Sequence, residues 1–589
     1  MFSFSIFGRK EGFTLLSPKS VAKWLEERPK GDVLATVDAA SALLRALPSE
    51  MEKPDLGQLQ ALVMLDDALA PKAAELTAQY VANVRTVGAL EKRLWASVYD
   101  LTLGFIAAYD FLMRELPQRM DAKRWQAGLL PLLVRLMRHR GIDAKFRLFR
   151  YEQWIPGRWR DLHSNYALAC RQGIDKTSTE VAGADGPRQT TIEREYLHTL
   201  LLQLMNTGNL APPQVEWLNS KLAAWSSGIA LTAHAKSAEG FYVDLSGVEG
   251  LRRKRFQPTG GQFLYLDSAP MHGTVVQYQQ ALKEELLKGP SRNVEDQINE
   301  QLSAISKVVD YFAPEFKPVT RNEPRAQEVI RARLVIGFRP SWTTLTEMDR
   351  WLERKAKGPA GAQKYSYTDK QALFIYGHIN EQTAKQREQQ EARAKEATAG
   401  DGPPMPVLGD PCQILDRGPT GCRVLTKGNG LTVSDLGTLA IFQEDGREEW
   451  TLGIVRRIKR MTADQVDLGL QIIAHRPVRI MLQAQRHRLP SGYSVDGEET
   501  TIQGQRREGF YLTPLDPDGK SASKTLIVPA SEYEANQVIN VNTGQTTYSI
   551  LLRHALERHA EWVWTTMEVV GKSAAAPTTP PTPAAGTSR

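Results

Sequence analysis

The sequence predicts an α+β multidomain protein: a helical N-terminal domain, then a small antiparallel β-barrel with a helical insertion and a β-rich C-terminal extension. Three observations support this fold class. Apolar residues recur at three- and four-residue spacing up to about residue 231, as on amphipathic helices. Short strand-like segments separated by Gly, Asp and Asn follow residue 411. A chain of 589 residues is also too long for a single core.

The domain boundaries follow from these changes of pattern. We expect, in order, a helical domain at 15–238, a mixed α/β linking segment at 239–315, a barrel at 316–482 with an insertion at about 350–408, a β-rich extension with a closing helix at 483–572, and a disordered tail at 573–589. The tail is predicted from its Pro-, Ala- and Thr-rich composition.

The helical domain is predicted from individual periodic segments. Asp55 and Asp121 stand where helix N-caps are expected, ahead of two of these segments. The expected helices include 39–47, 59–69, 90–116, 125–137, 193–205 and 213–231. No repeat of fixed period names the arrangement, so it is either a helical bundle or a short solenoid.

The linking segment and the insertion mix both patterns. Strands are predicted at 240–247, 261–270 and 328–338, and helices at 275–287 and 294–311. A charged helix is expected at 367–397, followed by a Gly- and Pro-rich linker at 400–411.

The barrel is predicted from successive short strands whose spacing is typical of a small antiparallel barrel. They read CQILDR, CRVLTK, LGTLAIFQ, EEWTLGIVRRIKR, QVDLGLQIIA and PVRIML. The β pattern continues over 486–542, and a closing helix is predicted at 548–562.

Two short motifs frame the start of the barrel. Arg321-Asn-Glu-Pro-Arg325 precedes the strand RARLVIGF, and Asp416-Arg-Gly418-Pro-Thr-Gly421 lies in a predicted turn. With the β pattern around them, these motifs make 321–481 resemble a PilZ domain, the bacterial receptor module for cyclic di-GMP. That family has RxxxR on an arm and D/NxSxxG in a barrel turn. Gly418 stands where the family has serine, and the roughly ninety residues between the motifs are interpreted as the insertion.

The resemblance implies a ligand-binding site made of Arg321, Arg325, Asp416, Gly418 and Gly421. Arginine clamps phosphate bidentately and also addresses guanine or stacks on it. A carboxylate in a rigid turn accepts hydrogen bonds from guanine N–H groups. The glycine that ends the turn, Gly421, is expected to provide a positive φ or a close approach of the backbone to the ligand.

This resemblance leads us to expect a cyclic di-GMP receptor or adaptor that relays nucleotide binding to an unidentified protein partner. One alternative is a non-catalytic scaffold with a degenerate barrel. Another is a nucleic-acid-binding protein that uses the stretch 135–160, where arginines alternate with aromatic residues. We favour a core role for those aromatic residues and expect no nucleic-acid partner. Their exposure in the structure discriminates between the two interpretations.

The sequence gives little support for a catalytic site, a metal site or a membrane-spanning segment. It contains no Walker A, GxSxG or HExxH motif, and we expect no enzyme activity, metal site or cofactor apart from the ligand cyclic di-GMP. Cys170, Cys412 and Cys422 form no disulfide framework. No apolar run reaches the length of a membrane span, and no signal peptide is recognised, so a cytoplasmic location is expected. A net charge of +7 mildly favours anionic partners.

Overall fold

The computed structural model describes residues 17–574 except for several gaps. These gaps are 30, 51–53, 85–87, 185, 237–238, 255–257, 316–328, 357–404, 429–430, 433–434, 463, 488–500, 513–523 and 543–545. The chain divides into two compact units. The helical unit contains 1–321 together with 432–436 and 458–461, and the barrel unit contains the remainder.

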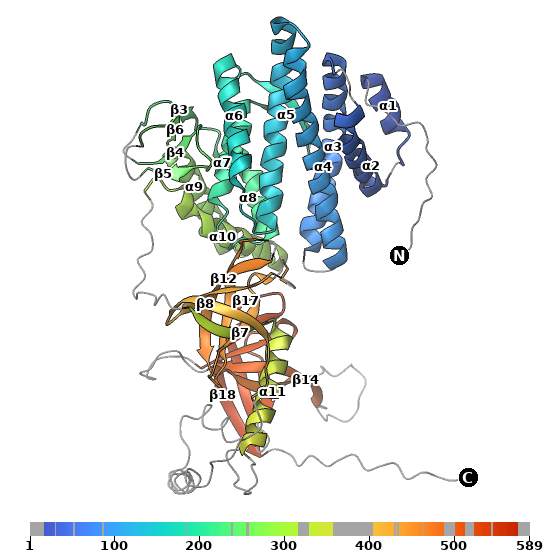
Figure 1. Ribbon diagram of the computed structural model, residues 1–589. Helices are drawn as coiled ribbons and strands as arrows, with labels where there is room; N and C mark the ends of the chain where they lie inside the picture. The colour runs from blue at the N-terminus through green and yellow to red at the C-terminus, as the bar shows by residue number, and fades with distance from the viewer. Residues whose placement is uncertain are drawn as a thin grey trace, which may run out of the picture. The chain divides into compact units, whose positions relative to one another are not determined.

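The helical unit begins with six α-helices, of which α3, α4 and α5 are each 28 residues long. Long helices run side by side in this unit (Figure 1), and α4 packs on α2, α3 and α5. Their bounds are α1 Pro18–Glu26, α2 Val33–Glu50, α3 Leu56–Asn83, α4 Gly88–Glu115, α5 Ala122–Phe149 and α6 Pro156–Gln172. The helical character predicted for the N-terminal region is therefore confirmed.

Local sequence explains where these helices begin and end. Asp55 accepts a hydrogen bond from the Gln58 N–H, and the Gln58 side chain accepts in return from the Asp55 N–H, so this N-cap is a capping box. Asp121 caps α5 through the N–H of Arg124, which confirms the second predicted cap. Helix α6 starts with proline and ends at Gly173, which adopts the left-handed conformation (φ 68°).

The rest of the helical unit mixes helices with short strands. The hairpin of β1 and β2 interrupts the predicted run of helices because Gly186 allows a tight turn with φ 116°. A small sheet in the order β3-β6-β4-β5 precedes the last two helices. The bounds are β1 Thr179–Gly183, β2 Gly186–Thr190, α7 Ile192–Leu204, α8 Pro212–Trp225, β3 Leu231–Thr232, β4 Phe241–Asp244, β5 Arg252–Arg253, β6 Phe263–Leu266, α9 Ala269–Leu287 and α10 Arg292–Phe312.

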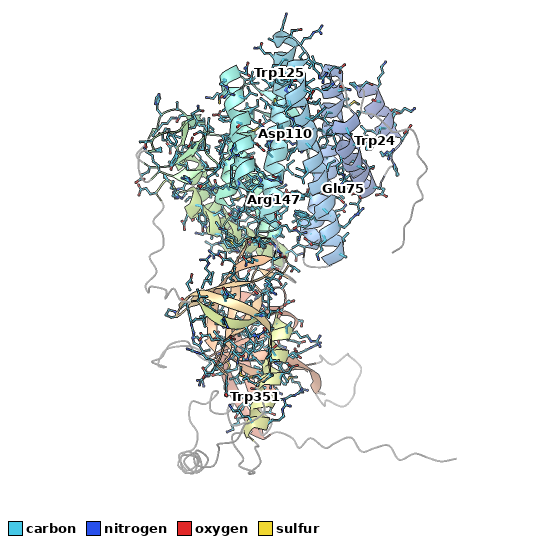
Figure 2. The ribbon with its side chains drawn as sticks, in the orientation of Figure 1. Trp24, Glu75, Asp110, Trp125, Arg147 and Trp351 are labelled. Carbon is cyan, nitrogen blue, oxygen red and sulfur yellow. The ribbon has the colours of Figure 1, made fainter. Side chains whose placement is uncertain are left out.

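The basic and aromatic stretch 135–160 belongs to the core of the helical unit. Four of its five aromatic side chains are buried, namely Phe146, Phe149, Tyr151 and Trp159. Its buried arginines are paired: Arg135 donates to Asp67, and Arg140 donates to Asp110, which is labelled in Figure 2. Rings held in a core are not available to stack on bases, so the preferred core interpretation is confirmed.

The barrel unit holds two closed six-stranded barrels. The first has the strand order β10-β11-β12-β9-β8-β7. The pairs β10–β11, β10–β7, β7–β8, β8–β9 and β9–β12 are antiparallel. Its bounds are β7 Ile330–Ile336, β8 Asp410–Gly418, β9 Gly421–Lys427, β10 Leu439–Glu444, β11 Thr451–Arg460 and β12 Gln465–His475. Helix α11, Phe338–Ala356, follows β7 in the long connection to β8. The predicted charged helix at 367–397 lies outside the described residues.

The second barrel has the order β13-β14-β15-β18-β17-β16. The sequence predicted β structure here but did not indicate closure into a separate barrel. The bounds are β13 Val478–His487, β14 Thr501–Leu512, β15 Thr525–Pro529, β16 Val538–Asn542, β17 Thr546–Arg558 and β18 Trp562–Ala574. Residues 575–589 of the predicted disordered tail are outside the described part of the chain.

The predicted closing helix at 548–562 is wrong. Most of this segment is strand β17, which pairs with β16 and β18. Tyr548, Ile550 and Leu552 are buried in alternation, as in a strand, and two irregularities of register follow Leu552. These irregularities break the two-residue period, so the distal half of the strand has apolar spacing that resembles a helix.

The α+β fold class is confirmed by the helical unit and the antiparallel barrels. None of the helices in the described ranges has the length and apolar character to cross a membrane.

Candidate functional site

The turn predicted to bind ligand is a tight hairpin of the first barrel. Asp416 and Gly418 lie at the end of β8, and Gly421 is the first residue of β9. Gly418 pairs with Gly421, so only Pro419 and Thr420 connect the two strands. Arg321 and Arg325, the other two predicted ligand residues, lie outside the described residues.

A β-bulge determines which way Asp416 faces. The register shifts between Ile414 and Asp416, so Leu415 is the extra residue, and Asp416 pairs with Arg423 of β9. Ile414 is buried inside the barrel, whereas Asp416 and Arg423 are both partly exposed. The bulge therefore places the Asp416 carboxyl group beside an outward-facing arginine.

Neither glycine of the hairpin adopts the left-handed backbone conformation. Among the described glycines, those with positive φ do not include Gly418 or Gly421. The positive φ considered for Gly421 is therefore not observed. The other reason considered for a glycine at position 421, a close approach of the backbone to a ligand, is consistent with this geometry.

Two arginines and a glycine extend this outward face across the neighbouring strands. Gly469 of β12 pairs with Arg423 on one side. On its other side, a Cβ atom added to Gly469 would lie 3.1 Å from the Cβ of Arg457 of β11. The row Asp416, Arg423, Gly469 and Arg457 is called the hairpin face below. Because Gly469 has no side chain, the Arg457 side chain packs over this position, with its Nε 3.7 Å from where a Cβ would lie.

Asp467 holds both arginines of the hairpin face. This buried carboxylate accepts from Arg423 Nε at 2.9 Å and from Arg457 Nη2 at 3.1 Å. The hydrogen bond that Arg423 donates to Asp467 raises the pKa of the Arg423 guanidinium, and the negative charge of Asp467 adds to the effect. Both arginine side chains are still about 40% exposed. The carboxylate therefore orients the two cations and leaves part of each available to an incoming anion.

Sequence reasoning missed Arg423, Arg457 and Asp467. A signal for Arg423 was present, because it is two residues after Gly421 and shares its side of the strand. Placing Arg457 and Asp467 beside it requires the pairing of β9, β12 and β11, which the sequence pattern does not specify. Lys427 continues the outward side of β9 and is exposed.

Further charged groups surround the hairpin. Glu444, buried at the end of β10, accepts from Arg417 and forms an ion pair of 2.7 Å with Arg447. Burial lowers the pKa of His475, and the nearby charge of Arg417 lowers it further. Within the described ranges, no group of three His, Cys, Asp or Glu side chains is arranged to hold a metal ion.

The strand that follows the RxxxR motif enters the barrel beside the hairpin. Ile330, the first residue of β7, pairs with Ile414 of β8. The two strands are antiparallel, so the chain arrives at β7 from the end where Asp416 lies. Arg325 precedes Ile330 by five positions, a separation of at most about 18 Å along an extended chain.

Comparison with known families gives one match. The sequence model of the family described as "Cyclic-di-GMP receptor FimW, N-terminal domain" matches residues 19–236. This match covers most of the helical unit and lies outside 321–481, on which the PilZ resemblance is based. No curated protein and no solved structure matches the chain.

Proposed function

We propose that this protein is a receptor for cyclic di-GMP and that the nucleotide binds over the hairpin face of the first barrel. The observation that carries the proposal is the register that brings Asp416, Arg423 and Arg457 together where the chain enters β7. The family description supports the choice of ligand, because the matched family is that of a cyclic di-GMP receptor.

The proposed roles follow from the chemistry of the ligand, which has two phosphodiester charges and two guanine bases. Arg321 and Arg325 clamp the phosphates from the arm before β7, and the exposed parts of Arg423 and Arg457 provide further donors. Asp416 accepts from guanine N–H groups. Gly418 and Gly421 let the ligand approach the hairpin backbone.

The proposed receptor acts in the cytoplasm and has no catalytic step of its own. The protein exchanges between two conformations, and the nucleotide binds more tightly to one of them. Nucleotide binding to the barrel unit therefore increases the population of that conformation, which a protein partner recognises. We propose that the helical unit, which carries the family match, transmits nucleotide binding to the protein partner.

Calorimetric titration of the full-length protein with cyclic di-GMP tests this proposal. Each of Arg321→Ala and Arg325→Ala removes a charge-assisted contact of roughly 1.5–3 kcal/mol, so affinity should fall about ten- to hundredfold. Asp416→Ala should also weaken binding. A control, Arg124→Ala, removes a well-exposed arginine from the helical unit and should leave the affinity unchanged.

The outcomes separate the receptor from the alternatives. No wild-type binding at roughly 50 µM ligand would exclude the receptor and leave the scaffold. Binding that none of the barrel variants weakens would place the site elsewhere in the chain. Equal affinity for cyclic di-AMP would contradict the assigned contacts to guanine.

A further inference from the structure

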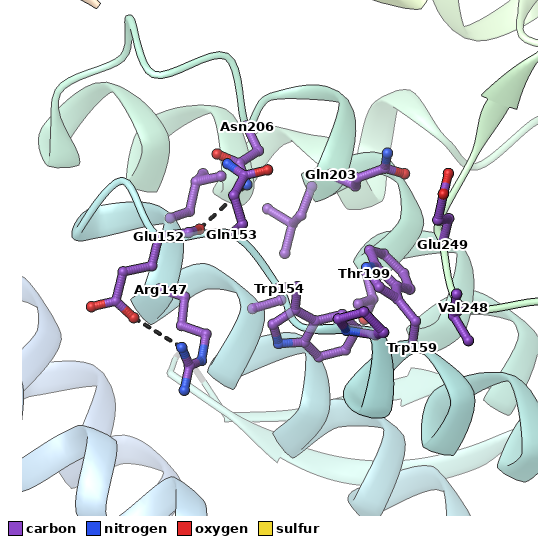
Figure 3. A pocket seen from close by; sticks show the side chains of 15 residues that line it. Arg147, Glu152, Gln153, Trp154, Trp159, Thr199, Gln203, Asn206, Val248 and Glu249 are labelled. Carbon is purple, nitrogen blue, oxygen red and sulfur yellow. Dashed lines mark hydrogen bonds and ion pairs between the residues drawn. The ribbon is translucent and has the colours of Figure 1, made fainter. Parts of the chain in front are cut away.

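The charged groups that line the cavity of the helical unit are paired one to one. This cavity of about 270 Å³ lies between the end of α5, the start of α6 and the end of α7 (Figure 3). Arg147 donates to Glu152 at 2.9 Å, and Arg252 donates to Glu249 at 2.6 Å. Each carboxylate of the lining therefore holds a cation, and the lining gives no charge preference for a ligand.

The hairpin face differs because two arginines share one carboxylate. Arg423 Nε and Nη2 lie 2.9 and 2.8 Å from Asp467 Oδ2, and Arg457 Nη2 lies 3.1 Å from Oδ1. Each arginine thus engages a different oxygen of the carboxylate. The Asp467 side chain is 3% exposed, whereas the arginine side chains are 40% and 42% exposed. A ligand on this face therefore meets the guanidinium groups, with the negative charge of Asp467 behind them.

Charged groups on the neighbouring strands lie further from this carboxylate or to one side of it. Asp416 of β8 pairs with Arg423, which places a second carboxyl group at one end of the row. Lys427 is exposed four residues along β9 from Arg423. That spacing corresponds to about 13 Å along the strand, beyond the Debye length of roughly 8 Å at physiological ionic strength. Asp467, which contacts both arginines, is therefore best placed to act on an anion that they bind.

A negative charge behind two cations acts differently on singly and doubly charged phosphates. A phosphate bound to the outer edges of the guanidinium groups would lie roughly 6–8 Å from Asp467. The Coulomb energy is proportional to the product of the charges, so Asp467 repels a doubly charged phosphomonoester twice as strongly as a singly charged phosphodiester. Hydrolysis of one phosphodiester opens cyclic di-GMP to the linear dinucleotide pGpG, whose terminal phosphomonoester carries close to two charges at pH 7.

We propose that Asp467 is a specificity-determining residue that disfavours pGpG relative to cyclic di-GMP at the hairpin face. This inference rests on the proposed function, because it concerns the same site. The carboxylate holds both arginines in place for a phosphodiester and repels a second charge on the phosphate. The receptor thereby distinguishes its ligand from the ring-opened product of that ligand, although both contain the same two guanine bases.

Calorimetric titration of the full-length Asp467→Asn variant with both nucleotides tests the proposal. Asparagine has nearly the same shape as aspartate but no charge, so the Kd for pGpG divided by the Kd for cyclic di-GMP should fall about three- to thirtyfold. The dinucleotide GpG lacks the terminal phosphate and should keep its affinity relative to cyclic di-GMP. The control Asp464→Asn removes an exposed carboxylate from the same region and should leave the ratio unchanged.

Two further measurements keep the test independent of one variant at one pH. The second pKa of a phosphomonoester is about 6, so at pH 5 the terminal group of pGpG is mostly singly charged and the effect of Asp467→Asn on the ratio should shrink. If Asp467→Asn alone does not fold, Arg423→Gln is compared with Arg423→Gln/Asp467→Asn. The double variant avoids two arginines that face each other without a carboxylate between them, and the ratio should fall as before.

The outcomes separate the inference from the proposed function. No binding of cyclic di-GMP to the wild type would remove the proposed function and the inference with it. Binding of cyclic di-GMP with a ratio that Asp467→Asn leaves unchanged would overturn the inference alone, because an equal loss for both nucleotides indicates a purely structural role. An equal fall of the ratio for Asp464→Asn would assign the effect to the overall charge of the protein and would also overturn the inference.

Discussion

At the scale of single residues, the β8–β9 hairpin lacks one hydroxyl group that the PilZ motif has. Gly418 occupies the serine position, pairs with Gly421 and does not have a positive φ. A serine is therefore compatible with the backbone at this position. The missing hydroxyl suggests that the proposed affinity is limited by side-chain chemistry and not by the shape of the turn.

We predict that Gly418→Ser tightens cyclic di-GMP binding. One added neutral hydrogen bond contributes about 0.5–1.5 kcal/mol, which corresponds to roughly a two- to tenfold gain in affinity. Calorimetric titration of the full-length variant measures this gain. Gly418→Ala serves as the control, because it changes the backbone preference without adding a donor. Equal effects of serine and alanine would assign the change to the backbone.

A second residue-scale feature is the buried carboxylate of Asp66 in α3. It accepts from Tyr109 Oη at 2.9 Å, and His139 Nε2 lies 2.9 Å from the same oxygen. Burial alone raises the pKa of Asp66. The charge and hydrogen bond of His139 outweigh burial, with help from two arginines, and hold the pKa at about 2. The ionised form is therefore the one that suits the folded helical unit.

We predict that Asp66→Asn destabilises the helical unit at pH 7 by about 2–4 kcal/mol. The folded pKa of Asp66 is below its unfolded value, so its contribution to stability is present above about pH 4 and is lost as the pH falls toward 2. Urea unfolding followed by circular dichroism at 222 nm measures both effects. The difference between variant and wild type should shrink in acid.

The matched control for Asp66 lies on the same helix. Glu75 of α3 is exposed and labelled in Figure 2, so Glu75→Gln should change the unfolding free energy by less than about 0.5 kcal/mol. A loss for Asp66→Asn that stays constant from pH 7 to pH 3 would contradict the ionic origin of its contribution.

At the scale of elements, capping residues were better guides than apolar spacing. Asp55 and Asp121 predicted two helix starts because an N-cap acts through local hydrogen bonds that the neighbouring sequence supplies. The segment 548–562 was wrongly predicted as a helix. Strand β17 is defined by pairing with distant strands, and its bulges disturb the alternation of buried and exposed residues. Such long-range pairing leaves no reliable local signal.

The connection between β7 and β8 supports a prediction about elements. Helix α11 must be kept, because Leu345, Met348 and Trp351 are part of a buried core. Residues 357–404 are rich in charge and end in a Gly- and Pro-rich stretch. Replacing 357–404 with a short Gly/Ser linker should leave the barrels folded.

Yield of soluble protein and the near-ultraviolet circular dichroism spectrum measure the outcome of this deletion. As a matched comparison, a replacement that begins at 345 should cause aggregation, because it removes the apolar face of α11. Insoluble protein from the 357–404 replacement would show that the segment is needed for folding.

At the scale of the whole molecule, the proposed ligand site and the family match fall in different units. The hairpin face belongs to the barrel unit, and residues 19–236 belong to the helical unit. If binding is relayed, cyclic di-GMP should change hydrogen exchange in both units. A ligand at a hundredfold excess over its Kd adds about 2.7 kcal/mol of stability, which slows exchange in the β8–β9 and β12 peptides by up to about a hundredfold.

Hydrogen exchange measured by mass spectrometry on the full-length protein checks this prediction. The same experiment on Arg325→Ala, at the same ligand concentration, should lose the effect in both units. Protection confined to the barrel unit would mean that the ligand binds without relay to the helical unit. Protection confined to the helical unit would move the proposed site there.

The sequence predicted the secondary structure better than it predicted which strands pair over long distances in the chain. The order of helical and β-rich parts, the hairpin of Asp416 and the core role of Phe146 follow from local patterns. The second barrel and the partnership of Arg423, Arg457 and Asp467 do not, because strand pairing across many residues decides them. The candidate site was thus found only in part.

The placement of α11 has a consequence for the order in which the chain folds during synthesis. One apolar cluster joins Trp351 of α11 and Ile441 of the first barrel to Phe510 and Trp562 of the second. When a ribosome has completed β12, α11 has been made, but Phe510 and Trp562, which the second barrel contributes to this cluster, have not. A nascent chain stopped there exposes apolar surface, which chaperones bind and which promotes aggregation. We therefore expect the two barrels to complete their folding together, after β18 has emerged.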